Sequence, residues 1–235
     1  MIELRIIAEL SQDPLWVNTF NDGGDLHSIL CSKTFGIPLE DVKKPFPYRP
    51  EVNYRFVQKT TNFGLAYGMS EYKLAETIQV PINQAKDIID KFFKVVPKVK
   101  SFLESISKVG MIKGMIRTPP PSRIRFFPQH KEAIESGDDK AIAAIGRMSK
   151  NHPIQGANAN ITKLALCKIQ DRIDLENLDM KILLPIHDAI LVEAHKNIQE
   201  YAIKLVQEEM ITAAETLIKS VPVKVDTVVG DCWLH

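Results

Sequence analysis

The chain has 235 residues, 45% of them hydrophobic, which is enough to bury the core of one large domain or two small ones. Lysine and arginine number 30 against 29 acidic residues. This balance neither indicates nor excludes a nucleic-acid partner, because a local basic stripe can bind phosphates on a neutral chain. Cys31, Cys167 and Cys232 form no CxxC pair, which disfavours disulfides or zinc and fits a reducing compartment. No apolar run approaches the roughly 18 residues that span a bilayer, so we expect no membrane partner.

The first half of the chain predicts helices interrupted by one proline-rich loop. Weak alternation of apolar residues at 2–9 predicts a strand. Pro50 and Glu51 suit the first turn of a helix that Gly68 would end. In chain order we expect a strand at 2–9, a short helix opened by Asp13-Pro14, a helix at 26–34 capped by Asp25, a loop at 43–50, a helix at 50–68, and amphipathic helices at about 82–95 and 97–109.

The second half predicts strands as well as helices. In chain order we expect a hairpin at 111–127 around Thr118-Pro-Pro-Pro-Ser122, a helix at 139–151 interrupted at Pro153 and resuming to 173, strands at 180–185 and 189–193, a helix at 197–218, and a closing strand at 223–229. Because helices and strands are partly segregated along the chain, the sequence predicts an α+β fold.

The strongest chemical pattern is a set of residues repeating every four positions. It reads Arg55-x3-Lys59-x3-Phe63-Gly64-x2-Tyr67-Gly68. On a helix these side chains form one slowly drifting stripe. Arginine suits a terminal phosphate, lysine places a point charge nearer a reacting phosphorus, and an aromatic ring can stack a base. The competing interpretation, an amphipathic helix with a solvated basic edge, is disfavoured by the completeness of the set.

Two further patterns are weaker when each is taken alone. His187-Asp188 lies between two apolar runs, where a hairpin would present a carboxylate as a hard oxygen ligand for a metal ion. A turn aspartate that binds backbone amides is the common alternative. Arg147-x3-Asn151-x3-Gln155 forms a polar stripe whose amides match the acceptor-rich DNA minor groove. A polar cluster at the end of a helix would give the same sequence pattern.

These patterns, in this order, resemble the family A DNA polymerases, the group of bacterial DNA polymerase I. Glu3-Leu4-Arg5 is similar to the end of that family's motif A, and the Arg55 to Gly68 set to its fingers helix, motif B. His187-Asp188 is similar to motif C, and Gly230-Asp231-Cys232-Trp233-Leu234 to the family's C-terminal Gly-Asp/Glu-x-Trp. The resemblance covers essentially the whole chain. It implies a helical fingers subdomain at 31–139 and a partial palm with a small antiparallel sheet at 1–30 and 140–235.

The resemblance also implies a role for each matching residue. Catalysis and metal binding would fall to Asp188, with Lys59 contacting inner phosphates and protonating the departing pyrophosphate. Glu3 would exclude a 2′ hydroxyl. The nucleotide-binding set would be Glu3, His27, Arg55, Lys59, Phe63 and Tyr67, with His27 and Arg55 on the outer phosphates; the DNA-binding set would be Arg123, Arg125, Arg147, Asn151, Gln155 and His187. The implied cofactor is Mg²⁺, as two ions, and the implied partners are dNTPs and primer-template DNA. The implied location is the cytoplasm of a bacterial cell or a phage-infected host.

The sequence departs from the family pattern at two acidic positions and at a hairpin tip. Motif A in the family reads Asp-Tyr-Ser-Gln-x-Glu-Leu-Arg, and here Met1 occupies the Gln position. Motif C usually reads His-Asp-Glu, and here Ala189 follows Asp188. The proline-rich tip replaces a Gly-Arg-Arg-rich one, so Arg123 and Arg125 could equally be plain surface arginines. A single carboxylate cannot offset two divalent cations. We therefore expect the N-terminal palm, thumb and exonuclease regions to be absent, and a separate N-terminal fragment to supply the motif A aspartate.

The function indicated is DNA-directed DNA polymerisation by phosphoryl transfer. A non-catalytic DNA-binding or assembly subunit derived from such an enzyme is the main alternative, and loss of Arg55 or Lys59 would have supported it. Both residues are present. A related single-subunit RNA polymerase is disfavoured by Glu3, which would exclude the ribose 2′ hydroxyl.

Overall fold

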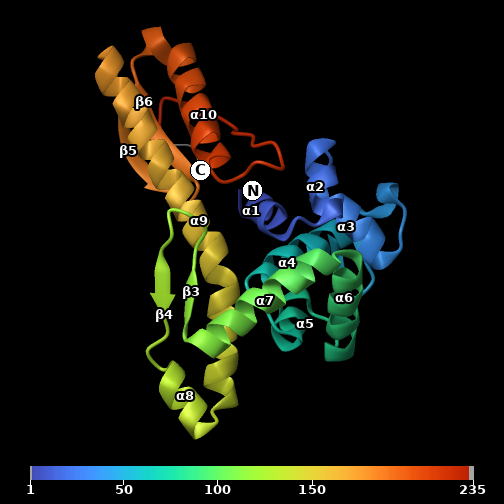
Figure 1. The fold of residues 1–235 in the computed structure, drawn as a ribbon. Coiled ribbons are helices and arrows are strands. Elements are labelled where there is room, and N and C mark those ends of the chain that lie inside the picture. The colour runs from blue at the N-terminus through green and yellow to red at the C-terminus, as the bar shows by residue number, and fades with distance from the viewer. Residues whose placement is uncertain (1, 233–235) are drawn as a thin grey trace.

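The computed structural model describes residues 2–232 and shows helices grouped around one long helix, with three short hairpins (Figure 1). This mostly helical architecture with small antiparallel sheets confirms the α+β prediction. The α-helices are α1 (Ile2–Ser11), α2 (Pro14–Asn21), α3 (Leu26–Phe35), α4 (Tyr54–Ala66), α5 (Glu71–Ile78), α6 (Ile82–Val95), α7 (Pro97–Lys113), α8 (His130–Ser136), α9 (Asp139–Glu176) and α10 (Gln199–Glu215). The strands are β1 (Pro45–Phe46), β2 (Arg49–Asn53), β3 (Met115–Arg117), β4 (Ile124–Phe126), β5 (Met180–Ile186) and β6 (Ala189–Ala194), with 3₁₀ turns η1 (Leu39–Asp41) and η2 (Lys196–Ile198).

The strand expected at residues 2–9 is wrong, because this segment is helix α1. Both periods are present in its sequence. Ile2, Leu4 and Ile6 alternate, while Leu4 and Ile7 lie three apart, as on a helical face. Leu4, Ile6 and Ile7 are fully buried in a core made of other helices. Packing on helices therefore decided between two patterns that the local sequence left nearly equal.

The helix starts of the first half are set by side-chain caps. Asp13 accepts a hydrogen bond from the Leu15 amide and Asp25 accepts one from the His27 amide, which confirms the expected starts of α2 and α3. The expected helix start at residue 50 is wrong. Strand β2 occupies that position, and Asn53 caps α4 by accepting from the Phe56 amide.

The expected loop at 43–50 also contains strand β1, which pairs with β2 as a hairpin. Helix α5 was not expected, although it carries ordinary end signals. The Ser70 hydroxyl caps its N-terminus, and the left-handed Gln79 ends it.

Helix α9 is continuous through Pro153, so the expected interruption is wrong. Proline lacks the amide proton of the helical ladder and crowds the preceding turn, which usually breaks a helix. Here Pro153 is buried, and the next turns place Ile154 and Ala157 in the main core. Tertiary packing on both sides of the proline holds the helix together. Near its start, α9 crosses α7 where Gly110 faces Ser149, and a side chain at Gly110 would collide with the serine.

Within residues 2–232, the sheets are three separate antiparallel hairpins: β1–β2, β3–β4 and β5–β6. The second is shorter than the predicted 111–127 because α7 extends to Lys113. The strands predicted at 180–185 and 189–193 are confirmed as β5 and β6. The helix predicted at 197–218 is divided into η2 and α10. The closing strand predicted at 223–229 is wrong: no described strand pairs with it, and Val228 is 79% exposed.

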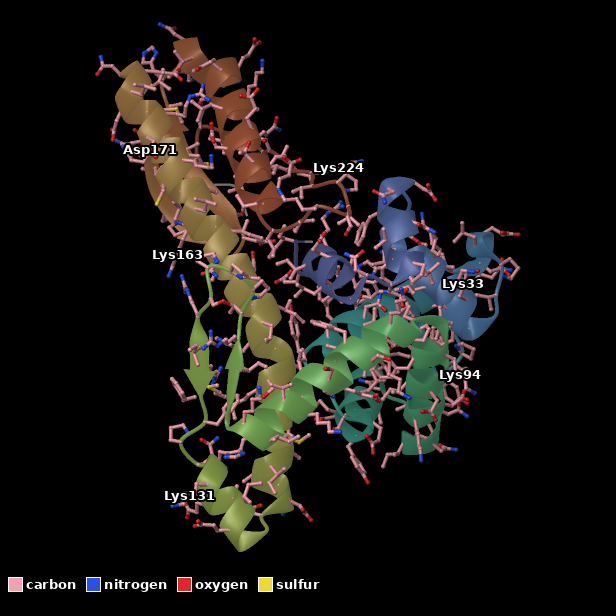
Figure 2. All side chains as sticks on the ribbon, in the orientation of Figure 1. Lys33, Lys94, Lys131, Lys163, Asp171 and Lys224 are labelled. Atoms are coloured by element: carbon pink, nitrogen blue, oxygen red, sulfur yellow. The ribbon has the colours of Figure 1, made fainter. Side chains whose placement is uncertain are left out.

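The largest buried cluster joins α1, α2 and α3 to α6, α7 and the middle of α9. A second cluster packs the β1–β2 hairpin, α5 and α6 against α4, and a third packs the β5–β6 hairpin and α10 against the end of α9. Long charged side chains cover the outside (Figure 2). Across residues 2–232, the search for a helix with the length and hydropathy of a membrane span finds none. The end of α4 and the β5–β6 hairpin both border the largest cluster, since Phe63 and Ile190 each pack against it.

Candidate functional site

The residues of the first motif lie along one face of α4. Val57, Thr61 and Leu65 bury the opposite face, and the Asn53 cap fixes where the helix begins. Lys59 is exposed and Arg55 and Phe63 are half-buried, so the stripe lies at the edge of the core. The structure thus places an arginine, a lysine and an aromatic ring four residues apart in succession, about one helical turn each, at the edge of the core.

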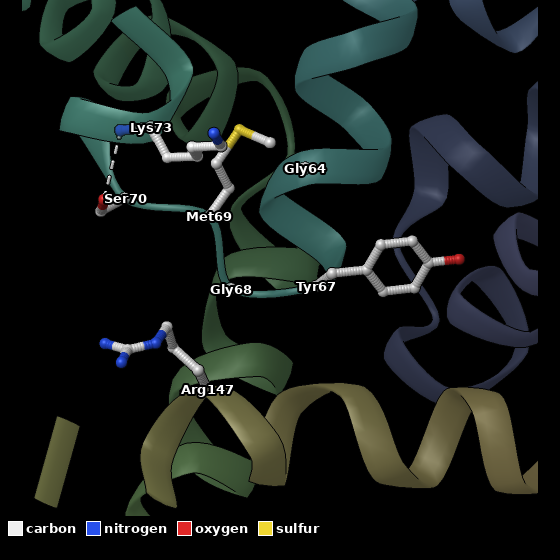
Figure 3. Close-up of a pocket in the computed structure, with 7 residues that line it drawn as sticks. All are labelled: Gly64, Tyr67, Gly68, Met69, Ser70, Lys73 and Arg147. Carbon is white, nitrogen blue, oxygen red and sulfur yellow. Dashed lines mark hydrogen bonds between the residues drawn. The ribbon is translucent and has the colours of Figure 1, made fainter. Parts of the chain in front are cut away.

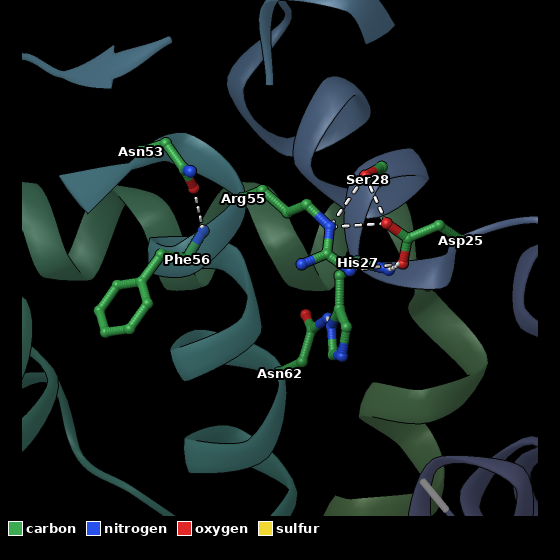
Figure 4. A network of polar contacts seen from close by, with 7 residues as sticks. All are labelled: Asp25, His27, Ser28, Asn53, Arg55, Phe56 and Asn62. Carbon is green, nitrogen blue, oxygen red and sulfur yellow. Dashed lines mark hydrogen bonds and ion pairs between the residues drawn. The ribbon is translucent and has the colours of Figure 1, made fainter. Parts of the chain in front are cut away.

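Arg55 is held by an ion pair with Asp25, the cap of α3 (Figure 4). Its Nε donates to Asp25 Oδ2 at 2.6 Å, and its Nη2 donates to Asp25 Oδ1 at 3.0 Å. Arg55 Nε also donates to the Ser28 hydroxyl at 3.1 Å. Burial raises the pKa of Asp25, but the hydrogen bonds from Arg55 and Ser28 outweigh it and bring the pKa down to about 2. The guanidinium is therefore already oriented by α3.

His27 lies beneath the stripe and is 1% exposed. Its Nδ1 is 2.8 Å from Asn62 Nδ2, on α4. Burial lowers the pKa of His27 to about 4, with Asp25 opposing that shift and the charges of Arg55 and Lys59 adding to it. The ring is therefore neutral at pH 7. Its centroid is 5.7 Å from that of Phe63, which makes His27 part of the wall behind the stripe.

Tyr67 is the residue at which the separate motifs meet. Its ring stacks with that of Phe63, with centroids 6.4 Å apart, and its hydroxyl accepts a hydrogen bond from Gln155 Nε2 at 3.0 Å. Burial raises the pKa of Tyr67 to about 12, and the charges of Glu3 and Asp188 add to the rise, while the Gln155 hydrogen bond opposes it. Side chains from α1, α4, α9 and the β5–β6 hairpin therefore converge at one phenol.

An open pocket of about 360 Å³ lies on the other side of Tyr67 (Figure 3). Gly68, at φ +79°, ends the helix there and lies against Arg147 of α9. A side chain at Gly68 would be 3.2 Å from Arg147, so the chain can approach α9 this closely only without one. The lining residues are Gly64, Tyr67, Gly68, Met69, Ser70, Lys73 and Arg147. The pocket joins the first and third motifs.

The remaining residues expected to bind DNA lie along α9 and on the β3–β4 hairpin. Asn151 is partly buried, and its Oδ1 has no hydrogen-bond partner among the described residues. Arg123 and Arg125 are exposed on the hairpin, and their charges lower the pKa of His152 on α9, although burial lowers it most. The hairpin arginines therefore lie beside α9 near Asn151, separate from the α4 stripe.

The β5–β6 hairpin turns through His187 and Asp188, because Ile186 pairs with Ala189. His187 adopts φ +57°, which is uncommon for a residue with a side chain and marks a tight two-residue turn. No group of three or more His, Cys, Asp or Glu residues that could hold a metal occurs in the described part of the chain. Ala189 follows Asp188, so no second carboxylate comes directly after this acid in the turn.

Sequence reasoning missed Gln58 and Asn62. Both are buried amide side chains on α4, and Gln58 Nε2 donates to Asn62 Oδ1 at 2.6 Å. In the sequence, only their positions could have indicated them. They lie three and seven residues after Arg55, on the face of α4 turned to the core. Polar residues at core positions require partners, and this requirement could have drawn attention to them. Asp25 was expected as a helix cap, but its ion pair with Arg55 was not.

The cationic-to-aromatic stripe of α4 ends at Tyr67, where the charges of Glu3 and Asp188 also act. The sequence model described as DNA polymerase family A matches residues 1–235, and the chain belongs to this family.

Named relatives agree with this assignment. The thermostable DNA polymerase I of Thermus aquaticus is 33% identical over 233 residues, covering 99% of this chain and 26% of the relative. DNA polymerase I of Geobacillus stearothermophilus is 32% identical over 232 residues, covering 99% of this chain and 25% of the relative. The chain therefore spans about a quarter of the length of these curated relatives. A solved structure, the POL domain of Pol1 from M. smegmatis in complex with DNA primer-template and dNTP, matches with a TM-score of 0.79 and 32% identity over 91% of this chain and 35% of that one.

Proposed function

We propose that this chain is the nucleotide-binding and primer-end portion of a DNA-directed DNA polymerase, which adds dNTPs to a primer 3′ end. The observation that carries this proposal is the convergence on Tyr67. Glu3, Gln155 and Asp188 come from three different elements and act on one phenol at the end of the cationic stripe. A nucleotide lying along α4 would thus have its phosphates near the cations and its sugar near the acids.

Within this proposal, the stripe binds the nucleotide by its phosphates and stacks its base. Lys59 and Arg55 contact the triphosphate, Phe63 packs on the sugar and base, and Tyr67 borders the template position. Glu3 excludes a 2′ hydroxyl from the space beside Tyr67. Because Arg55 is held by Asp25 in this structure, binding of a triphosphate requires the guanidinium to exchange or share that partner.

Arg147, Asn151 and Gln155 form the DNA-facing part of the proposal. They occupy one side of α9, four residues apart, and Gln155 and Arg147 each lie against the end of α4. These three side chains would contact primer-template DNA along its minor groove. Arg123 and Arg125 would bind its backbone with a salt-dependent affinity. His187 would lie near the primer end.

We also propose that Asp188 is one ligand of a Mg²⁺ site whose other carboxylate comes from outside these 235 residues, from an N-terminal polymerase fragment. Ala189 in place of a second acid after Asp188 supports this, because one carboxylate cannot offset two divalent cations. Mg²⁺ would neutralise phosphate charge when bound. The part played by this chain is to hold the dNTP and the primer end in register.

Two assays test the proposal separately. The first measures binding of a dNTP with Mg²⁺ to the chain and to Lys59→Ala, with Lys91→Ala as a control that removes an equal charge from an ion pair on α6. We expect the wild type and Lys91→Ala to bind the dNTP, and Lys59→Ala to bind it more weakly. Absence of dNTP binding to wild type would refute the polymerase function and favour a non-catalytic DNA-binding subunit.

The second assay measures primer extension by the chain alone and with an added N-terminal palm fragment of a family A relative. Extension only in the mixture is expected, and it should be lost with Asp188→Asn. Robust extension by the chain alone would refute the need for an outside carboxylate.

A further inference from the structure

Three buried side chains form a continuous polar chain behind the α4 stripe. Gln58 is fully buried, and Asn62 and His27 are each 1% exposed. Gln58 Nε2 donates to Asn62 Oδ1 at 2.6 Å, and Asn62 Nδ2 lies 2.8 Å from His27 Nδ1. Figure 4 shows the Asn62 amide beside the imidazole, with the Arg55–Asp25 ion pair above them in this view. Buried polar groups are costly unless paired, and at the far end of this chain Gln58 Oε1 has no hydrogen-bond partner among the described residues.

The direction of these hydrogen bonds fixes the proton of the imidazole. The Asn62 oxygen is occupied by the Gln58 amide, so the Asn62 group that faces the ring is its NH₂, which can only donate. His27 Nδ1 must then accept, and a neutral imidazole carries its single proton on Nε2. The imidazole is neutral at pH 7 because burial lowers the pKa of His27 to about 4.

His27 Nε2 is buried and has no hydrogen-bond partner among the described residues. A buried N–H without an acceptor is uncommon and requires an explanation. Asp25, Arg55 and Lys59 all lie close enough for their charges to act on the imidazole, and Asp25 is already paired with Arg55. An acceptor placed between two cations and a neutral donor would be an anion such as a phosphate oxygen.

We propose that Gln58 and Asn62 are positioning residues that hold the His27 imidazole with its Nε2–H presented to a phosphate oxygen of the incoming triphosphate. This inference rests on the proposed function, since it assumes that His27 meets the nucleotide. It adds an assignment for two residues that touch no substrate themselves. Gln58 acts through Asn62, and Asn62 acts through the ring.

The first test is the protonation of His27 in the 235-residue chain labelled with ¹⁵N-histidine. Long-range ¹H–¹⁵N spectra are expected to show the proton on Nε2 in the wild type. Gln58→Met, which keeps length but cannot donate, frees the Asn62 amide to rotate, and both tautomers should then appear. Thr61→Val is the matched control, because Thr61 is buried on the same helix and its hydroxyl donates to the Val57 carbonyl, away from the described polar chain. A proton on Nδ1 in the wild type would overturn the proposal without reference to any variant.

The second test is the affinity for dNTP with Mg²⁺. Gln58→Met and Asn62→Leu, both neutral, are expected to bind about tenfold more weakly, in line with the loss of one oriented hydrogen bond to a charged group. Thr61→Val should bind like the wild type. If the wild type carries its proton on Nε2 but both variants bind dNTP with wild-type affinity, the positioning role is overturned. If the variants fail to fold, the Nε2 resonance of the wild type decides. A resonance that does not change when the chain is saturated with dNTP also overturns the proposal.

The two hypotheses can fail independently. If the wild type does not bind dNTP, the proposed function fails, while the spectra still decide whether the tautomer is fixed by Gln58 and Asn62. If Lys59→Ala loses affinity and Gln58→Met does not, the nucleotide site stands and the positioning role is wrong.

Discussion

Helix α4 and the β5–β6 hairpin both carry residues expected to act on the nucleotide, yet the chain supports them differently. The site residues at α4 are fixed by neighbours: Arg55 of α4 is held by Asp25 and Ser28, and Asn62 of α4 holds His27 of α3. The hairpin carries Asp188 at a turn, and two of its apolar residues are well exposed, Leu183 by 45% and Leu184 by 39%.

The difference follows from what each element packs against. Helix α4 lies between two buried clusters, so its polar side chains are held from both sides. The hairpin has α9 and α10 on one face, and its other face is partly exposed. We infer that this chain by itself preorganises the nucleotide end of the site.

The largest expected effect concerns stability and contrasts the two environments. Phe92→Ala, in the main core, should lower the free energy of unfolding by about 3–5 kcal/mol through lost burial and a residual cavity. Leu183→Ala, on the exposed hairpin face, should cost less than about 1 kcal/mol. Urea unfolding of both variants measures this. Equal losses would show that the hairpin is as tightly packed as the helical region.

The next effect concerns the nucleotide end. Lys59→Ala should weaken dNTP binding about 10- to 100-fold, because a charge-assisted contact to phosphate is lost. Titration of labelled dNTP in Mg²⁺ measures it. Asp188→Ala should change this binding much less if α4 alone preorganises the site. A comparable loss in Asp188→Ala would mean that both regions hold the free nucleotide together.

A smaller effect isolates the contact between α4 and α9. Gly68→Ala should lower the free energy of unfolding by about 1–3 kcal/mol, since φ is +79° and the new methyl group would crowd Arg147. Gly137→Ala is the matched control. Its φ is +66°, but a methyl group there would meet no atom within 4 Å. A loss for Gly68→Ala no greater than for Gly137→Ala would contradict the tight contact with Arg147.

The smallest effect tests the ion pair of Asp25 as a function of pH. The pKa of Asp25 is lowered from 3.8 to about 2, so the folded state binds fewer protons than the unfolded state between these values. The stabilisation is therefore present above about pH 4 and lost as pH falls through about 2. Because the carboxylate is 39% exposed, solvent screening limits it to below about 1 kcal/mol.

Asp25→Asn tests this, because asparagine is an equally good helix cap while the charge and one of the two oxygens that accept from Arg55 are removed. Urea unfolding at pH 7 should give Asp25→Asn a lower free energy of unfolding than the wild type. At pH 2.5 this difference should be smaller. Asp22→Asn, a nearby exposed carboxylate, is the control. A deficit independent of pH would show that the ion pair does not stabilise the fold.

Short-range signals in the sequence determined much of this protein. The caps at Asp13 and Asp25 fixed two helix starts, and the four-residue spacing from Arg55 to Tyr67 placed the stripe on one helix. The strands around His187-Asp188 were also readable from their apolar runs. Each of these depends on residues within a few positions of one another, so no distant partner is needed to recognise them.

The tertiary structure alone decided what depends on partners distant in sequence. It made residues 2–11 a helix, carried α9 through Pro153, and left 223–229 without a described strand to pair with. It also joined His27 to Asn62 and Arg55 to Asp25 across 35 and 30 positions. The physical reason is the same in each case: burial and hydrogen bonding between distant segments outweigh local preference, and the chain order does not reveal which segments will meet.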